Sequence, residues 1–343
     1  MKIKSILYLL LSISIIAFAS CTHTNNKSET KKADTVSQNS PEELKQLNSQ
    51  ILAQPANADL YHHRAKYYFN VKEYQKGFVD MATALKIDSS KAEYYLTLSD
   101  LYFITNQTGS TKAALEKCIT LDNKNTDAML KLAELYLYVS KNELSMKYIN
   151  MALKINQYNS KAYFMKGMNY KAIKDTARAI SSMQTAVEQD QQYYNAYIQL
   201  GILCAAKNNP LAVQYYKNAL RIEPKSTEAW YNLGKYFQDI KDLNNALETY
   251  SKLLQIDNQN KNAHYNIGVI NFVYLKKYGI AIDHFTEAIK IEPKFVQAYY
   301  GRGICYQAKG DIKLATTDFQ ACLDINPKYE PAQIALKELK RTK

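Results

Sequence analysis

The chain has 343 residues, 47% of them hydrophobic, and its 44 basic and 32 acidic residues give a net charge of +12. This length suits two ordinary domains or one repeat array. The charge alone would suggest a nucleic-acid partner, but the N-terminal segment argues against one. Lysines on solvated helix faces explain the excess, and weak attraction to anionic lipid or cell-wall polymer is the alternative.

The N-terminus has the features of a secretion signal. Lys2 and Lys4 precede an apolar run over residues 6–18, which small residues follow. A basic flank before a short apolar run is typical of signal peptides, and the run is shorter than the roughly 20 residues that cross a bilayer. The sequence therefore predicts a signal peptide over residues 1–20 and no membrane-spanning helix in this run.

The end of this segment indicates a lipid anchor. Ala19 and Ser20 directly before Cys21 resemble the lipobox of bacterial lipoproteins. This resemblance implies that Cys21 carries acyl chains such as palmitate and becomes the mature N-terminus, and several such chains anchor a protein stably. A plain secretory signal that is cleaved nearby is the alternative.

The residues after the cysteine predict a tether and a location. Residues 21–41 contain almost no apolar side chain, so they cannot bury a core and should form a flexible linker. Thr22 is not the aspartate that retains some lipoproteins at the inner membrane, and the first acidic residue is Glu29. We therefore expect attachment to the outer membrane of the cell envelope, on the periplasmic face.

The next segment predicts a helix that caps a larger structure. Residues 42–52 read as one amphipathic helix, and the sequence places four apolar side chains on its inner face: Leu44, Leu47, Ile51 and Leu52. Pro55 stands where a helical repeat often ends. Residues 42–57 are therefore interpreted as an N-terminal capping half-repeat.

A fixed period occupies the rest of the chain. Its clearest copy consists of residues spaced 3, 1, 3, 9 and 4 apart: Trp230, Leu233, Gly234, Phe237, Ala246 and Tyr250. This pattern resembles the tetratricopeptide repeat, a helix–turn–helix unit of about 34 residues. Units begin near residues 58, 92, 126, 160, 194, 227, 261 and 296, with one spacing a residue short and one a residue long.

The resemblance implies an all-α fold, a right-handed superhelical solenoid with eight units over residues 58–329. Gly234 is then a packing residue at the crossing of two helices, because a larger side chain would overpack it. A closing helix is expected at residues 330–343, with Ala332, Leu336 and Leu339 facing back on the array.

No catalytic or metal-binding constellation is apparent in the sequence. His62 and His63 are adjacent and point about 100° apart on a helix, His264 occupies the tryptophan position of its unit, and His284 is isolated on a second helix. Apart from Cys21, the four cysteines lack C-x-x-C spacing and fall on buried repeat positions. We expect no enzyme activity, no cofactor, no metal and no small-molecule substrate.

In this family the first helix of each unit lines a concave groove, and the residues between its anchors face that groove. We call these residues the intervening positions. The second to fifth units have apolar residues there: Leu96, Phe103, Leu130, Leu137, Tyr138, Phe164, Met165, Met168, Ile198 and Ile202. The sixth to eighth units have phenols and amides there: Tyr231, Asn232, Tyr265, Asn266 and Tyr300.

Exposed apolar surface marks interaction sites, and paired asparagines suit the backbone of an extended peptide. Some of these side chains could instead pack against the next unit. The sequence therefore predicts a non-catalytic scaffold that binds segments of envelope proteins. A permanent structural subunit of an outer-membrane or secretion machine is the alternative.

Overall fold

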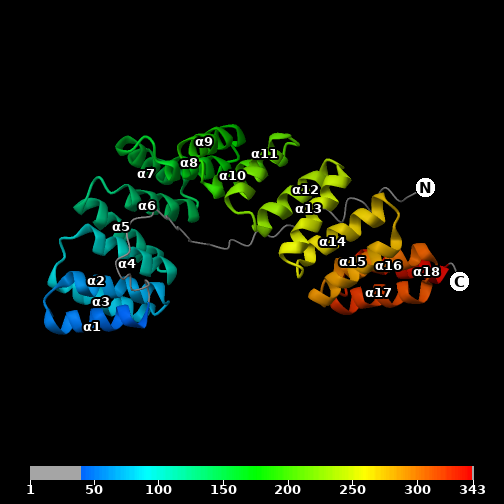
Figure 1. Cartoon of the computed structure of the whole chain (residues 1–343), viewed down its shortest axis with the longest axis horizontal. Coiled ribbons are helices and arrows are strands. Elements are labelled where there is room, and N and C mark those ends of the chain that lie inside the picture. The colour runs from blue at the N-terminus through cyan, green and yellow to red at the C-terminus, as the bar shows by residue number, and fades with distance from the viewer. Residues whose placement is uncertain (1–39, 342–343) are drawn as a thin grey trace. The chain divides into compact units, whose positions relative to one another are not determined.

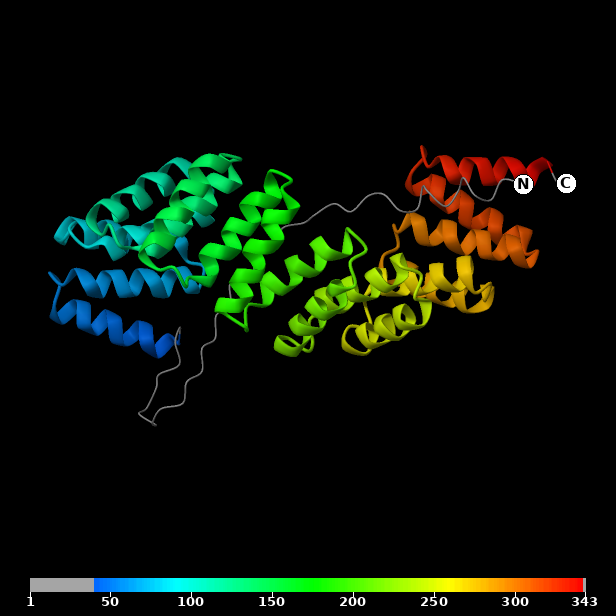
Figure 2. The same ribbon diagram turned by 90° about the horizontal axis from the view of Figure 1, so that it is seen from above.

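The computed structural model describes residues 40–341, so Cys21 and the predicted signal and tether lie outside the described residues. Within that range the chain forms eighteen α-helices and one π-helix and no strand. Consecutive helices pack against each other in pairs, as the ribbon shows from two directions (Figures 1 and 2). The chain divides into two compact units, residues 40–196 and 197–341.

The helices of the first compact unit run in chain order from the N-terminal cap to the fourth repeat. They are α1 (Pro41–Ala53), α2 (Ala58–Asn70), α3 (Tyr74–Ile87), α4 (Ala92–Ile104), α5 (Thr108–Leu121), α6 (Thr126–Tyr138), α7 (Asn142–Ile155), α8 (Ser160–Ala172) and α9 (Thr176–Gln189). Helix α10 (Tyr194–Ala205) begins at the end of this unit.

The second compact unit continues the alternation to the C-terminal cap. Its helices are α11 (Leu211–Ile222), α12 (Thr227–Asp239), α13 (Leu243–Ile256), α14 (Lys261–Val269), the π-helix η1 (Ile270–Tyr274), α15 (Tyr278–Ile291), α16 (Val296–Lys309), α17 (Ile312–Ile325) and α18 (Glu330–Arg341). The all-helical fold of paired helices predicted from the sequence is confirmed.

Local signals in the sequence set the start of most first helices. A polar side chain immediately before the helix accepts a hydrogen bond from a backbone N–H of the first turn, which satisfies a donor that the helix itself cannot. These caps are Asn57, Asn125, Asn159, Ser226 and Asn260. The same place in the repeat is therefore polar in most units.

The turn inside each unit is equally regular. One residue between the two helices adopts a left-handed backbone with positive φ, a conformation that costs side-chain-bearing residues more than glycine. These residues are Lys72, Asn106, Ser140, Lys174, Asn208, Lys241, Lys276 and Gly310. The turn geometry is thus imposed by the packing of the two helices and not by glycine alone.

The glycine inside the first helix of the sixth unit is a packing residue, as predicted. A Cβ atom built on Gly234 would lie 2.7 Å from Cε1 of Tyr250, inside ordinary van der Waals contact. Tyr250 is fully buried on the facing helix α13. The absence of a side chain at Gly234 lets the tyrosine ring lie against the backbone of α12.

The irregular spacings have local structural causes. In the long seventh unit, the extra residue is taken up where α14 passes into the π-helix η1, a wider turn that absorbs an insertion without breaking the helix. Asn271 is buried there, and its amide donates to the carbonyl of Ile267 at 2.9 Å. In the short fifth unit, helix α11 has 12 residues and begins directly after Pro210.

Helices α1 and α18 cover the two ends. In α1, Leu47 and Ile51 are buried, but Leu52 is 83% exposed, so its predicted inward orientation is wrong. Leu52 follows Ile51 by one residue and therefore points about 100° away from the buried stripe. In α18, Ala332 and Leu339 are buried against α17 and Leu336 packs on the same core cluster, as predicted.

The first and the last unit each contain a buried arginine–aspartate ion pair that the sequence did not predict. The Arg64 guanidinium binds both carboxylate oxygens of Asp80 at 2.7 Å and reaches Asn48 on the capping helix. Arg302 binds Asp318 in the same bidentate way at 2.9 and 2.8 Å. Both carboxylates are almost fully buried, so each arginine is required to compensate a buried charge.

The four described cysteines are buried and reduced, as predicted. Burial raises the pKa of the thiols of Cys305 and Cys322 to about 12, because the thiolate would lose its hydration. These thiols behave as small hydrophobic side chains.

Candidate functional site

The intervening positions differ widely in exposure. Four of the predicted binding residues are buried: Leu130, Met165, Ile198 and Tyr300. Nine are partly buried: Leu96, Leu137, Phe164, Met168, Ile202, Tyr231, Asn232, Tyr265 and Asn266. Phe103 and Tyr138 are 42% and 71% exposed. The apolar stripe expected from the sequence is therefore open only in part.

The four buried residues are a correction to the sequence interpretation. Leu130 on α6 and Met165 on α8 belong to one core cluster with Ala133 and Ile149, because the first helices of neighbouring units contact each other. Tyr300 belongs to the core cluster under α18. These side chains hold units together and are not available to a partner.

Aromatic residues directly before the next first helix cover several intervening positions. The rings of Phe164 and Tyr193 lie 5.1 Å apart, and those of Tyr265 and Phe295 also lie 5.1 Å apart. Tyr329 meets Tyr300 edge-on at 5.7 Å. Such tilted and edge-on pairs are favourable contacts.

The covering role of Tyr193, Phe295 and Tyr329 was not predicted from the sequence. The sequence does contain a signal for this role, because these three residues are aromatic at a position where other units have a polar helix cap. Their burial has an electrostatic consequence: desolvation raises the pKa of Tyr193, and it raises the pKa of the covered Tyr300 to about 12. Both phenols remain neutral at physiological pH and contribute as apolar rings.

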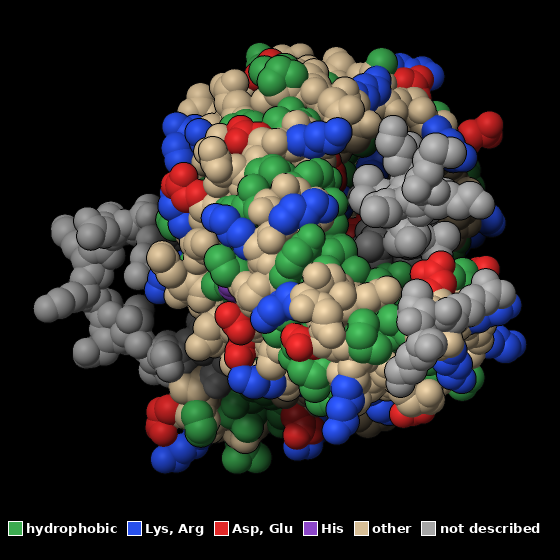
Figure 3. Space-filling view, turned by 90° about the vertical axis from the view of Figure 1, so that its right-hand side faces the viewer, with side chains coloured by type: hydrophobic (Ala, Val, Ile, Leu, Met, Phe, Trp, Pro, Cys, Tyr) green, Lys and Arg blue, Asp and Glu red, His purple; other side chains and the backbone are tan. Residues whose placement is uncertain are grey.

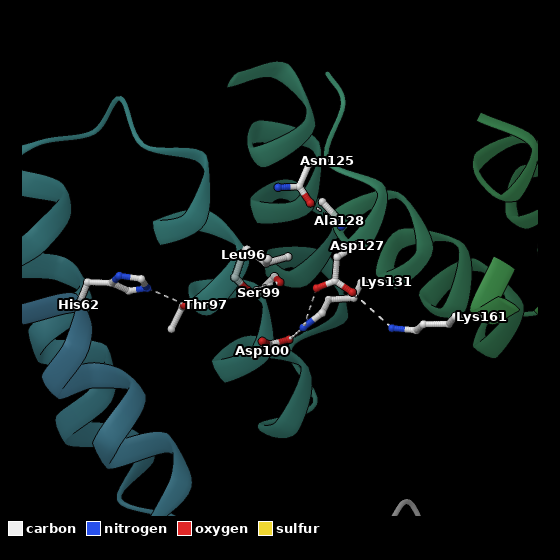
Figure 4. Close-up of polar contacts among 10 residues, drawn as sticks. All are labelled: His62, Leu96, Thr97, Ser99, Asp100, Asn125, Asp127, Ala128, Lys131 and Lys161. Carbon is white, nitrogen blue, oxygen red and sulfur yellow. Dashed lines mark hydrogen bonds and ion pairs between the residues drawn. The ribbon is translucent and has the colours of Figure 1, made fainter. Parts of the chain in front are cut away.

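A row of charged side chains links the second to fourth units (Figure 4). The Lys131 ammonium lies 2.5 Å from Asp100 on the preceding first helix and 3.9 Å from Asp127 on its own helix. Asp127 in turn lies 3.3 Å from Lys161 on the following first helix. We call these four residues the charged row.

The charged row crosses from one first helix to the next, so it lies along the array and not within one unit. Its side chains are between 25% and 48% exposed, and pairs of this kind each contribute about 0–1 kcal/mol to stability. Their contribution to the stability of the fold is therefore small.

Further polar contacts link the first unit to the second. His62 contacts the hydroxyl of Thr97 on the next first helix through Nε2 at 2.8 Å (Figure 4). Burial lowers the pKa of His62 to about 4, so the imidazole is neutral at pH 7. Asp59 accepts from Lys91 at 2.5 Å and from the Tyr94 hydroxyl, and these hydrogen bonds lower the pKa of its carboxyl.

The predicted pair of asparagines is not equivalent in the structure. The Asn266 amide donates to the Tyr250 hydroxyl at 3.0 Å, and that hydroxyl donates to Gln238 at 3.0 Å. This chain of hydrogen bonds joins the sixth and seventh units. Asn232 takes no part in it, so only Asn232 keeps its amide for a ligand of the kind the sequence suggested.

Metal sites need grouped ligand side chains, and membrane spans need long apolar helices. Residues 40–341 contain no group of three histidine, cysteine or acidic side chains placed to hold a metal ion. No helix in that range is long and apolar enough to cross a membrane. On the face shown in Figure 3, lysine and arginine side chains are interspersed with acidic and uncharged ones.

Paired helices in a 34-residue period define a repeat architecture in which each unit packs on its neighbours. The tetratricopeptide repeat model matches residues 296–329, and the model of the ChAPs (Chs5p-Arf1p-binding proteins) matches residues 33–271, more than half of the chain. The chain is therefore a tetratricopeptide-repeat protein that belongs to the ChAPs family. Neither model describes a catalytic family.

Individual relatives are distant and longer than the region they share with this chain. The DnaJ homolog subfamily C member 7 homolog of Dictyostelium discoideum is 24% identical over 213 residues, which are 57% of this chain and 39% of that protein. Human protein O-mannosyl-transferase TMTC3 is 26% identical over 187 residues, 50% of this chain and 20% of that protein. The match therefore spans less than half the length of either relative.

A solved structure confirms the fold. The C-terminal part of a TPR repeat-containing protein from Cytophaga hutchinsonii superposes with a TM-score of 0.61 at 20% sequence identity. The superposition covers 70% of this chain and 98% of that one. The shared feature is the helical repeat architecture.

Proposed function

We propose that this chain is a non-catalytic scaffold that is attached to the bacterial outer membrane through acylated Cys21 and binds segments of envelope proteins. Binding takes place on the intervening positions of the first helices. The fold supports the scaffold role, since tetratricopeptide repeats are protein-binding modules, and the ChAPs family is itself described by the proteins its members bind. The lipobox resemblance supports the location.

The exposure of Phe103 and Tyr138 is the observation that carries the proposal. They lie near the C-terminal ends of α4 and α6, and neighbouring Ile104 is 47% exposed. Repeat packing buries apolar residues earlier in the same helices, such as Leu101 and Leu130. Large apolar side chains that the fold itself leaves open are the usual anchors of a partner. We call Phe103, Ile104 and Tyr138 the apolar rim.

The chain provides a matched pair of sites for a crosslinking test. Tyr138 is 71% exposed on the apolar rim, and Tyr158 is 65% exposed in the connection between α7 and α8. A photoreactive phenylalanine analogue placed at either position in intact cells should give a discrete crosslinked protein at Tyr138 and not at Tyr158. Equal crosslinking at both positions, or none at Tyr138, would refute the binding role of the apolar rim.

The same experiment distinguishes a permanent subunit of an envelope machine from a scaffold that binds its partners reversibly. A partner that crosslinks in nearly all molecules under every growth condition would indicate a permanent subunit of an envelope machine. Partial crosslinking that Phe103→Glu abolishes, with an unchanged melting temperature, would support reversible recruitment. Val79→Glu is the matched control, because Val79 is 59% exposed on the second helix α3.

The membrane anchor is tested separately. Cys21→Ser should prevent incorporation of labelled palmitate and release the protein from the membrane fraction. If the unaltered chain takes up no palmitate and fractionates with soluble proteins, the lipoprotein assignment is wrong, whatever the outcome at the apolar rim.

A further inference from the structure

Two histidines from facing helices meet in the seventh unit. His264 on α14 and His284 on α15 approach with their Nδ1 atoms 3.1 Å apart, and their rings are 5.3 Å apart at an angle of 39°. Both side chains are partly buried, so solvent reaches them. The sequence showed them as unrelated residues because twenty positions separate them along the chain.

A backbone contact sets the tautomer of the first ring. Nε2 of His264 lies 3.3 Å from the carbonyl oxygen of Asn258, so its N–H donates to that oxygen. This tautomer leaves a lone pair on Nδ1 of His264, directed toward His284. Histidines that bind metals commonly donate their other N–H to a backbone carbonyl in this way.

The separation of the two nitrogens fits a metal ion. Bonds from imidazole nitrogen to zinc are about 2.0–2.1 Å long. Two such ligands with nitrogens 3.1 Å apart subtend an angle of about 98° at the ion, between the square-planar and tetrahedral values. Rotation of the rings about χ2, a soft torsion in histidine, can direct both lone pairs at one point.

We propose that His264 and His284 form a two-histidine site for a divalent first-row transition-metal ion, such as copper, nickel or zinc. Imidazole suits these ions, and affinity for a given nitrogen site rises from nickel to copper. Hard cations such as magnesium prefer oxygen ligands and are not expected to bind.

Proton balance is simple. In the metal-free molecule, Nδ1 of His284 carries the hydrogen that it donates to Nδ1 of His264. On metal binding this proton moves through solvent to Nε2 of His284, so both Nδ1 lone pairs bind the ion and no net proton is released. Each ring remains neutral throughout.

The described residues around the two histidines supply no further metal ligand. Asp283 and Glu287 on α15 place negative charge beside His284, which favours a cation. Glu287 already pairs with Lys290 at 2.7 Å, and the described residues offer no third ligand at bonding distance. The remaining coordination positions are therefore open to water or to a side chain of a bound partner.

Calorimetric titration of the full chain with nickel chloride at pH 7.5 tests the proposal, with protein purified without a histidine tag. We expect one nickel ion per chain. His264→Asn and His284→Asn should each lower the affinity at least about tenfold, since even outer-shell changes at metal sites cost 10–100-fold. His63→Asn is the matched control, because His63 is exposed beside another histidine on α2 and should leave binding unchanged.

A second measurement does not depend on the variants folding. Nickel is paramagnetic, so it should broaden the imidazole NMR signals of His264 and His284 in the unaltered chain before those of the other histidines. The proposal is overturned if the unaltered chain binds no nickel, if His264→Asn and His284→Asn bind nickel as the unaltered chain does, or if other histidine signals broaden first.

Discussion

Replacing Gly234 with alanine tests the packing argument directly. The new Cβ would lie 2.7 Å from Cε1 and 2.9 Å from Cδ1 of Tyr250, whose ring is fully buried and cannot swing into solvent. Overpacking of this kind costs about 1–3 kcal/mol. Alanine recovers at most about 1 kcal/mol through its better helix propensity. We therefore expect Gly234→Ala to lower the free energy of unfolding by up to about 2 kcal/mol.

Gly279 is the matched control, because it also lies in a helix but a Cβ there would meet nothing within 4 Å. Gly279→Ala should be neutral or stabilise by up to about 1 kcal/mol. Thermal and urea unfolding, followed by circular dichroism, measure both, with about 2–4 °C expected per kcal/mol. Equal stabilisation by the two alanines would refute the packing role of Gly234.

A double-mutant cycle isolates the contact from helix propensity. Tyr250→Leu removes the ring that the new Cβ would strike, although it destabilises the chain by itself. In that background Gly234→Ala should cost less than in the unaltered chain, because the two positions are coupled. An unchanged cost would show that the clash with Tyr250 is not its cause.

Three further predictions concern charge and the end of the array. Stability should fall as the pH falls from about 6.5 toward 4, because the unfolded chain protonates His62 first while the folded pKa is about 4; urea unfolding as a function of pH should show a shallower decline in His62→Gln. Arg302→Leu should lower the free energy of unfolding by about 3–5 kcal/mol, because it leaves Asp318 buried without its partner. Adding Asp318→Thr gives the leucine and threonine that the sixth unit has at these positions, and it should restore most of the lost stability in the same urea-unfolding assay. Deleting residues 330–343 should cost at most about 3–6 kcal/mol and promote association, seen by melting and light scattering, because it uncovers the core under α18.

The architecture could be predicted because its signals are local and repeated. The small residue of the first helix, the aromatic residue that crosses it and the helix caps recur in unit after unit, so errors in one unit are corrected by the others. Even the insertion in the seventh unit was visible as a spacing, although the π-helix that absorbs it near Asn271 was not. Packing of the four cysteines followed from their repeat positions.

Exposure of the first helices could not be predicted in the same way. It depends on side chains that arrive from a neighbouring unit, as Tyr193 does over Phe164 and Phe295 over Tyr265. The pairing of Lys131 with Asp100 is of the same kind, since these residues belong to successive first helices. The residue pattern of one helix does not show contacts made by another unit. It therefore predicted a single apolar stripe that includes both the covered and the exposed residues.

In the binding role proposed above, the residue before each first helix affects access to the intervening positions as well as helix initiation. Where it is aromatic, as at Tyr193, Phe295 and Tyr329, it covers the ring that would otherwise face a ligand. Where it is a polar cap, as at Asn125, it occupies little of that surface, and what remains open near the end of the helix is the apolar rim. In the first compact unit, Ile104 follows Asp100 by four residues and Tyr138 follows Lys131 by seven, so the apolar rim lies on the same helix faces as the charged row, whose members are already paired. A partner segment that inserts apolar side chains and presents a backbone or neutral polar groups to the charged row binds without breaking an ion pair. One that brings an unmatched charge to Lys131 must disrupt its contacts with Asp100 and Asp127.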